Sequence, residues 1–498
     1  MDSWLITTHD FIAATPLHWI LHSRHRWLTT AFTFLLIVAG GSGCSWLLAE
    51  FGIIPLAALV LVVGYALLAL RNIEVAYGGV IGLVTLLPFG SLPFSIGFTP
   101  TFLDLALGGL FLIWLAPLIL GQRKLELVAT PLDGPVAAFA LLAIGAFVAG
   151  LAHSPLGSYL LRHFAEVLLS IGFFFLVTNT VTGIERLKRL TRVFLLLAGG
   201  AALLGIILYV MPDSLAMQAL SALGRVGYPV GGGVLRYIRD DPALMQRATA
   251  TSVDPNVLGS LLNLALAIAL PQLFTSHPVL KRGLLIPLIA LLGLCLGLTV
   301  SRGSMVGAVA AIGMLGAMRY RKLFLLLLLA LALILLLPWT RGYSAHFVEG
   351  LQGEDLSTKM RFGEYKDAFI LIGRHPLLGV GFGGTPDIDT YLGVASIYLL
   401  IAEQMGLLGL ASFLLIVGIL LYRFGNRWYR KILPPPALEP FWYGYHGALV
   451  GGLVGGVFDH YFFSLDFHHS VTIFWLILAL ATVTTQLFTA SETPTGNE

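Results

Sequence analysis

The sequence predicts an all-α polytopic membrane protein with about 12–14 transmembrane helices. Composition is the first reason: of 498 residues, 57% are hydrophobic and only 11% are charged, whereas soluble domains carry about 25% charged residues. The second reason is the length of the apolar runs, because a helix needs roughly 17–25 residues to cross a bilayer. These runs are centred near residues 38, 61, 81, 111, 141, 170, 200, 264, 291, 311, 330, 409, 448 and 478.

The polar stretches between these runs divide the chain into segments. Two of the stretches, 212–252 and 339–395, are too polar to span, and we expect the second to contain an amphipathic helix. The predicted segments are an N-terminal cytoplasmic or interfacial stretch (1–26), an N-terminal transmembrane bundle (27–211), an outer loop (212–252), further transmembrane helices (253–338), a large outer loop (339–395), C-terminal transmembrane helices (396–488) and a cytoplasmic tail (489–498).

The short loops indicate the orientation, because cytoplasmic loops of membrane proteins are enriched in Lys and Arg. With the N-terminus in the cytoplasm, alternate loops carry basic residues, whereas the opposite loops GSLPFSIGFTPT and LAHSPLG contain none. Both long loops then face outward. The formal net charge of +3 is too small to indicate a nucleic-acid partner.

The charges on the predicted outer side are strongly biased towards arginine. The arginine fork matches phosphate oxygens bidentately, which lysine does not, so the bias indicates a phosphate-bearing ligand such as a lipid phosphate or pyrophosphate. The alternative is that these arginines form ordinary surface ion pairs. The outer side contains Arg225, Arg236, Arg239, Arg247, Arg302, Arg341, Arg361 and Arg374, against only Lys359 and Lys366.

Four stretches, in this order, carry a resemblance to a known family. They are QRATATSVDPNVLGSLLNLALAIALP from Gln246, TVSRGSMVGAV from Thr299, RFGEYKDAFILIGRHPLLGVGFGG from Arg361, and IYLLIAEQMGLLGL from Ile397. With its arginine before a Pro-Asn pair, its Ser-Arg-Gly signature, its outer-loop helix and its Gly-Leu-Leu-Gly span, the chain resembles the O-antigen ligase and O-antigen polymerase superfamily of bacterial envelope enzymes.

This resemblance implies a membrane-embedded glycosyltransferase of the bacterial inner membrane with an active site facing the exterior. It would polymerise or ligate a glycan carried on undecaprenyl pyrophosphate, inverting the anomeric centre without a metal or other cofactor. Its partners would be this donor, a glycan acceptor, membrane lipid and a chain-length regulator. Arg302 and Arg247 match the family's pyrophosphate-binding arginines, and Arg361 is a third candidate. The expected substrate contacts are Arg225, Arg236, Arg239, Asn256, Ser301, Tyr398, His460 and His468.

The sequence departs from the family at one position. Many ligases have a histidine before the tyrosine of the Gly-Leu-Leu-Gly span, and here Ala395 and Ser396 stand at those positions. The missing histidine favours a polymerase over a ligase. Asp387 and Asp389 are candidates for the base that accepts the proton of the acceptor hydroxyl, although aspartate after proline is also a common turn residue.

Further ionisable residues stand at predicted span ends. Residues 457–471, VFDHYFFSLDFHHSV, contain two aspartates and three histidines, which would suit a metal ion, the acceptor side of a site or a polar lining. Arg162 and Glu166 are four residues apart on one helical face, which predicts an ion pair. Asp104 is expected to cap its helix or to reach the membrane surface.

Two other functions remain open from the sequence. One is a peptidoglycan polymerase of the shape, elongation, division and sporulation family. That family has related substrates, but its sequence around the signature acid matches the sequence around Asp387 poorly. The other is a flippase or transporter of lipid-linked glycans. Transporters place charges along a central path, whereas the charges here concentrate at the outer surface, which favours binding or chemistry there.

Overall fold

The computed structural model describes residues 53–92, 95, 97–119, 127–336, 356–385, 390 and 392–492, with scattered residues between 30 and 45. It divides into two units, Met1–Val80 with Ala106–Glu126, and Ile81–Leu105 with Leu127–Glu498. Asp387, Asp389 and the segments 1–26 and 337–355 lie outside the described residues.

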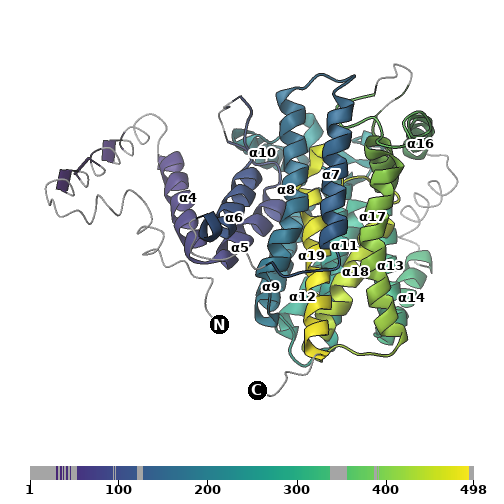
Figure 1. Cartoon of the computed structure of the whole chain (residues 1–498). Coiled ribbons are helices and arrows are strands. Elements are labelled where there is room, and N and C mark those ends of the chain that lie inside the picture. Colours follow the sequence, from purple (N-terminus) through teal and green to yellow (C-terminus); the bar gives the residue numbers. More distant parts are fainter. Residues whose placement is uncertain are drawn as a thin grey trace. The chain divides into compact units, whose positions relative to one another are not determined.

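The described residues are mainly helical, and this confirms the predicted fold class (Figure 1). Every predicted span centre from residue 61 onward falls on a helix, and eight of the described helices are long and apolar enough to cross a membrane. The apolar helices are α4 (Ile53–Arg71), α5 (Ile73–Leu86), α6 (Phe102–Ile119), α7 (Asp133–Gly150), α8 (Ser158–Thr180), α9 (Ile184–Val210), α11 (Pro255–Ala269), α12 (Arg282–Thr299), α13 (Arg302–Met318), α14 (Arg321–Leu336), α17 (Ile397–Tyr429), α18 (Glu439–Gly455) and α19 (His468–Glu492).

In the first unit, α4 and the beginning of α5 form a helical hairpin. The hydroxyl of Tyr65 donates to the carbonyl oxygen of Ala76 at 3.3 Å. A side chain at Gly79 would overlap the Tyr65 ring, so this glycine lets the two helices approach closely.

The core of the second unit is built from α11, α18 and α19. In the hydrophobic spans of α11 and α19, 89% of the residues are buried, whereas only 33% are buried in α7 and α12. α13 and α11 pack on α18, and α19 packs on α8 and α18 (Figure 1). A side chain at Gly307 would lie 2.4 Å from the carbonyl oxygen of Gly451, so small residues allow α13 and α18 to touch. Apolar residues of the outer helices remain exposed to the lipid.

Helix α17 is broken at the first glycine of Gly-Leu-Leu-Gly. Gly406 has φ 68° and ψ −174°, and a side chain there would lie 2.2 Å from the carbonyl oxygen of Leu377. The backbone of the preceding Pro-Leu-Leu-Gly-Val-Gly stretch takes the place of the missing helical bonds: Val380 N donates to Glu403 O at 2.9 Å, and Leu407 N donates to Pro376 O at 2.7 Å. The two motifs that carry the resemblance therefore form one packed unit.

The predicted loops contain short elements. Residues 212–252 hold α10 (Asp213–Ala222), three 3₁₀ turns (Leu223–Val226, Gly232–Val234 and Ile238–Asp240) and the antiparallel strands β1 (Arg236–Tyr237) and β2 (Gln246–Arg247), in which Arg236 pairs with Arg247. The predicted helix of the second loop is α16 (Leu356–Arg374), and two further 3₁₀ turns are Leu270–Phe274 and Leu465–Phe467.

Ion pairs join the helix ends on the side of the bundle that carries the basic loops. Arg319 at the end of α13 bonds Glu439 at the start of α18 at 2.9 Å, and Arg427 near the end of α17 bonds Glu492 at the end of α19 at 2.9 Å. These contacts align the basic ends of four helices. The starts of α13 and α19 therefore lie at the opposite end of the bundle. The start of α11 lies there too, because Phe274, just after α11, stacks on Tyr320, just after α13.

Candidate functional site

A cavity of about 370 Å³ opens at the end of the bundle where α11 and α13 begin. We call it the arginine cavity, because four arginines and only three carboxyl groups line it. Segments that are far apart in the sequence meet there: the β1–β2 hairpin, the starts of α11 and α13, α16 and the loop before α19. The lining residues are Ile238, Arg239, Asp240, Arg247, Asn256, Val300, Arg302, Met360, Arg361, Glu364, Ala395, Asp459, His460 and Tyr461.

Arg247 is held in place by two hydrogen bonds. Its Nε donates to the carbonyl oxygen of Thr299 at 2.9 Å, and its Nη2 donates to Oδ1 of Asn256 at 2.7 Å. Asn256 in turn belongs to the first turn of α11, where Asp254 caps the backbone N–H of Asn256 at 2.7 Å. Burial lowers the pKa of Arg247 and Asp254 opposes this, but a guanidinium stays charged in proteins. Arg247 is therefore a fixed cation before any ligand arrives.

Arg302 is the first residue of α13. Ser301 caps this helix by accepting from the backbone N–H of Ser304, and the Ser301 hydroxyl donates to Ser304 Oγ at 2.9 Å. Because the N-terminus of a helix carries partial positive charge, the helix end and the Arg302 guanidinium favour an anion in the same place.

Arg361 enters the cavity from α16. Its Nη2 lies 3.5 Å from Oδ1 of Asp459. Two neighbours on α16 bond the segment before α17: Glu364 accepts from the N–H of Ala395 at 3.1 Å, and the Tyr365 hydroxyl donates to the carbonyl oxygen of Ala395 at 3.4 Å. These bonds hold Ala395, one of the two residues at which the resemblance leads us to expect a histidine, at the edge of the cavity.

Asp459 lines the cavity as well, although the sequence analysis did not name it as a site residue. It is only 6% exposed, and burial raises its pKa to about 7, although Arg361 opposes this shift. A side chain at Gly303 would lie 2.6 Å from Oδ2 of Asp459, so the glycine of the Ser-Arg-Gly signature makes room for this carboxyl group. The density of Asp and His in residues 457–471 was the only signal for it.

Two neighbours of Asp459 complete this wall of the cavity. Burial lowers the pKa of His460, so its ring is neutral near pH 7. Burial also raises the pKa of Tyr461 well above its ordinary value, so its hydroxyl keeps its proton. A neutral imidazole and a phenol are suited to hydrogen-bond sugar hydroxyls.

The structure brings together six of the residues predicted from the sequence: Arg239, Arg247, Asn256, Arg302, Arg361 and His460 all line the cavity. Five others do not line it. Arg236 pairs with Asp240 at 3.8 Å, Ser301 acts as a helix cap, and the Tyr398 hydroxyl donates to Leu453 O at 2.9 Å. Arg225 ends a 3₁₀ turn, and His468 lies in a separate cluster with Asp104 and Glu166.

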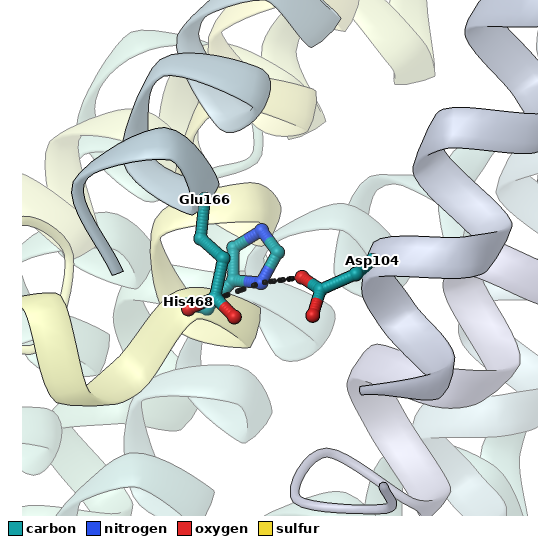
Figure 2. Close-up of side chains that lie close together, drawn as sticks. All are labelled: Asp104, Glu166 and His468. Atoms are coloured by element: carbon teal, nitrogen blue, oxygen red, sulfur yellow. Dashed lines mark ion pairs between the residues drawn. The ribbon is translucent and has the colours of Figure 1, made fainter. Parts of the chain in front are cut away.

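This carboxylate–histidine cluster is a second concentration of polar groups (Figure 2). The predicted pair is confirmed, because Arg162 Nε bonds Oε1 of Glu166 at 2.8 Å. The predicted cap is confirmed as well, because Thr101 N donates to Oδ2 of Asp104 at 2.8 Å. Asp104, Glu166 and His468 each offer one ligand atom within 4.8 Å of the others, and among the described residues they could hold a metal ion.

Comparison with known proteins identifies one part of the chain. Residues 287–414 match the family model described as O-antigen ligase. The match contains the Ser-Arg-Gly signature, α16 and the first part of α17 with its break at Gly406, and it confirms the resemblance predicted from the sequence. No curated protein matches the chain. This multi-pass membrane protein therefore carries a domain of the O-antigen ligase and polymerase superfamily, which acts in the biosynthesis of envelope polysaccharides.

Proposed function

We propose that the protein transfers a glycan from undecaprenyl pyrophosphate to an acceptor hydroxyl and so polymerises an envelope polysaccharide. The observation that carries this proposal is the convergence of Arg239, Arg247, Arg302 and Arg361 on one cavity. Arg302 and Arg361 also belong to the matched family domain.

The charges of the cavity suit a leaving pyrophosphate. In glycosyl transfer from a lipid pyrophosphate, negative charge accumulates on the oxygen that leaves the anomeric carbon, and fixed cations stabilise that charge in the transition state. Arg247 is preorganised by Asn256 and Thr299, and Arg302 adds its charge at the start of α13. We assign the pyrophosphate to these two arginines, with Arg361 as a further contact.

Asp459 is our candidate for the base. Its carboxylate would take the proton from the acceptor hydroxyl while the acceptor oxygen forms a bond to the anomeric carbon. The bond from that carbon to the pyrophosphate oxygen breaks, and the electron pair leaves with the lipid pyrophosphate. Attack from the face opposite the leaving group inverts the anomeric centre. The residues that act are all side chains of the protein, and the proposal assigns no metal or cofactor to this step.

Polymerisation is favoured over ligation by the residue at the acceptor side. Ala395, which with Ser396 stands where the resemblance leads us to expect the histidine of many ligases, lines the cavity, and Asp459 would supply a proton acceptor from a different part of the chain. We propose that the acceptor is a second lipid-linked glycan. The cavity lies at the end of the bundle away from the basic loops, which supports a site on the outer face of the bacterial inner membrane.

The test uses purified protein in nanodiscs with undecaprenyl-pyrophosphate glycan as the sole substrate. We expect the glycan to lengthen as undecaprenyl pyrophosphate is released. Arg302→Ala should lower the rate by about 10²–10³-fold, and Arg302→Lys should restore only part of it because lysine lacks the fork.

Arg319→Ala is the matched control, because Arg319 pairs with Glu439 at the other end of α13. Release that requires a foreign acceptor would make the protein a ligase. Glycan movement across the bilayer without release would make it a flippase and would refute the proposal.

A further inference from the structure

The carboxylate–histidine cluster joins three helices, α6, α8 and α19. Asp104 comes from the first turn of α6, Glu166 from α8 and His468 from the beginning of α19, and Figure 2 shows the three side chains pointing toward one another. All three belong to the second unit of the chain. From this geometry we propose that Asp104, Glu166 and His468 bind a divalent metal ion of the zinc or manganese class.

The distances in the cluster suit an ion of this size. His468 Nδ1 lies 3.5 Å from Oδ1 of Asp104 and 3.9 Å from Oε2 of Glu166. A tetrahedral ion with bonds of about 2.1 Å holds its ligand atoms about 3.4 Å apart. One imidazole and two carboxylates are ligands that zinc and manganese accept, and water would complete the coordination.

Three buried polar atoms of the cluster make no hydrogen bond to any described residue. This is true of both ring nitrogens of His468 and of Oδ1 of Asp104, and the His468 side chain is only 8% exposed. Buried polar atoms nearly always have a hydrogen-bond partner. A metal ion at this point would satisfy Nδ1 of His468 and Oδ1 of Asp104 at once.

Helix capping explains one oxygen of Asp104 but not the other. Asp133 at the start of α7 stands in the same Thr-x-x-Asp pattern, and both of its oxygens are used, by the N–H and the hydroxyl of Thr130 at 2.7 Å. At Asp104 only Oδ2 is used, by the N–H of Thr101. The remaining oxygen faces His468, so Asp104 does more than cap its helix.

Arg162 leaves the side of the cluster that faces the proposed ion open. Arg162 Nε lies 2.8 Å from Oε1 of Glu166 and 3.8 Å from Oδ2 of Asp104, so it contacts the oxygen of each carboxylate that does not face the proposed ion. His163 Nδ1 lies 3.0 Å from Oε2 of Glu166, close enough to orient this ligand, as outer partners of metal ligands do. Two carboxylates with one arginine keep a net negative charge, which attracts a dication.

The site would anchor the segment before α19. That segment supplies Asp459, His460 and Tyr461 to the arginine cavity, and His468 follows it directly. A bound ion would fix the end of this segment to α6 and α8. Its role is therefore positional, and the metal can be tested without measuring glycan transfer.

The test is metal binding to the full-length protein in detergent. The protein is stripped with EDTA, reloaded with Zn²⁺ or Mn²⁺, desalted and analysed for metal content and thermal unfolding. We expect an equimolar ion and a higher Tm after reloading. Asp104→Asn and His468→Gln keep the size of the side chains and should lose both effects. Asp133→Asn, which alters the same Thr-x-x-Asp pattern at the start of α7, should keep both.

The wild-type protein provides a second measurement if these variants do not fold. Reloading with Co²⁺ should give the visible d–d absorption of an ion bound by nitrogen and oxygen ligands in low symmetry, and Zn²⁺ should displace it. A wild-type protein that binds no ion, or Asn and Gln variants that bind it equally well, would overturn the proposal and leave a histidine–carboxylate ion pair.

Discussion

The arginine cavity and the carboxylate–histidine cluster both lie where several helices meet, but they present opposite charges. The cavity has a volume of about 370 Å³ and four arginines. In the cluster, two carboxylates and one histidine converge within 4.8 Å. A large cationic space fits an anionic group that enters and leaves, whereas a small closed anionic space fits an ion that stays.

The two places also differ in how far their side chains are held in position before a ligand binds. Arg247 is held by Asn256 and Thr299, so the cavity has its cations positioned before a ligand binds. In the cluster, Oδ1 of Asp104 and the ring of His468 make no hydrogen bond to described residues. The first arrangement is complete in the protein alone, and the second becomes complete with a ligand.

Removing Asp459, the proposed general base in the arginine cavity, should give the largest effect. Asp459→Asn should lower the rate of glycan transfer by about 10²–10⁴-fold. Because burial raises the pKa of Asp459 to about 7 and only the carboxylate can accept a proton, the wild-type rate should rise with pH through about 7. The variant's residual rate should not show this rise.

The control for this prediction is Asp466→Asn, which lies in the same loop but bonds the Tyr159 hydroxyl outside the cavity. Initial rates of undecaprenyl pyrophosphate release from pH 5 to pH 9 provide the measurement. An Asp459→Asn protein with a tenth or more of the wild-type rate would show that another group takes the proton.

Ligands that bind only one of the two sites should give a smaller effect, seen as a change in stability. Inorganic pyrophosphate at a hundred times its Kd should stabilise the protein by about 2.7 kcal/mol when the arginines are intact. The experiment uses the Asp104→Asn background, so that pyrophosphate cannot act by removing a metal. Adding Arg302→Ala to that background should abolish the rise in Tm.

The reverse comparison uses a chelator. In the Arg302→Ala background, EDTA should lower Tm, and adding Asp104→Asn should remove this effect. Equal responses to pyrophosphate with and without Arg302 would show that the anion binds elsewhere, and the assignment of the leaving group would fail.

The smallest effect is expected at Tyr398, which the sequence assigns to the substrate. Its hydroxyl donates to Leu453 O at 2.9 Å and does not line the cavity. Tyr398→Phe should therefore cost about 0.5–1.5 kcal/mol of unfolding free energy, the usual worth of one hydrogen bond. Denaturant unfolding measures this cost. A variant of unchanged stability whose glycan transfer is slower would return Tyr398 to the substrate site.

The sequence by itself determined the helical membrane fold and predicted a phosphate-bearing ligand. Apolar runs long enough to span a bilayer must become helices, because no water is present to satisfy the backbone. The same local reasoning predicted the Arg162–Glu166 pair, which depends on four-residue spacing, and the excess of outer arginines indicated a phosphate ligand. Arg247, Arg302 and Arg361 could be named because each stands in a recognisable motif.

Only the tertiary structure decided which of these residues meet. Asp459 lies beside Arg361 although 98 positions separate them, and nothing in the local pattern around Asp459 specifies that neighbour. His468 looked like one of several equivalent histidines in its loop, and its closeness to Asp104 and Glu166 depends on how α6, α8 and α19 pack. Spacing along a helix predicts contacts over a few residues, but contacts between distant helices are set by the packing of their whole faces.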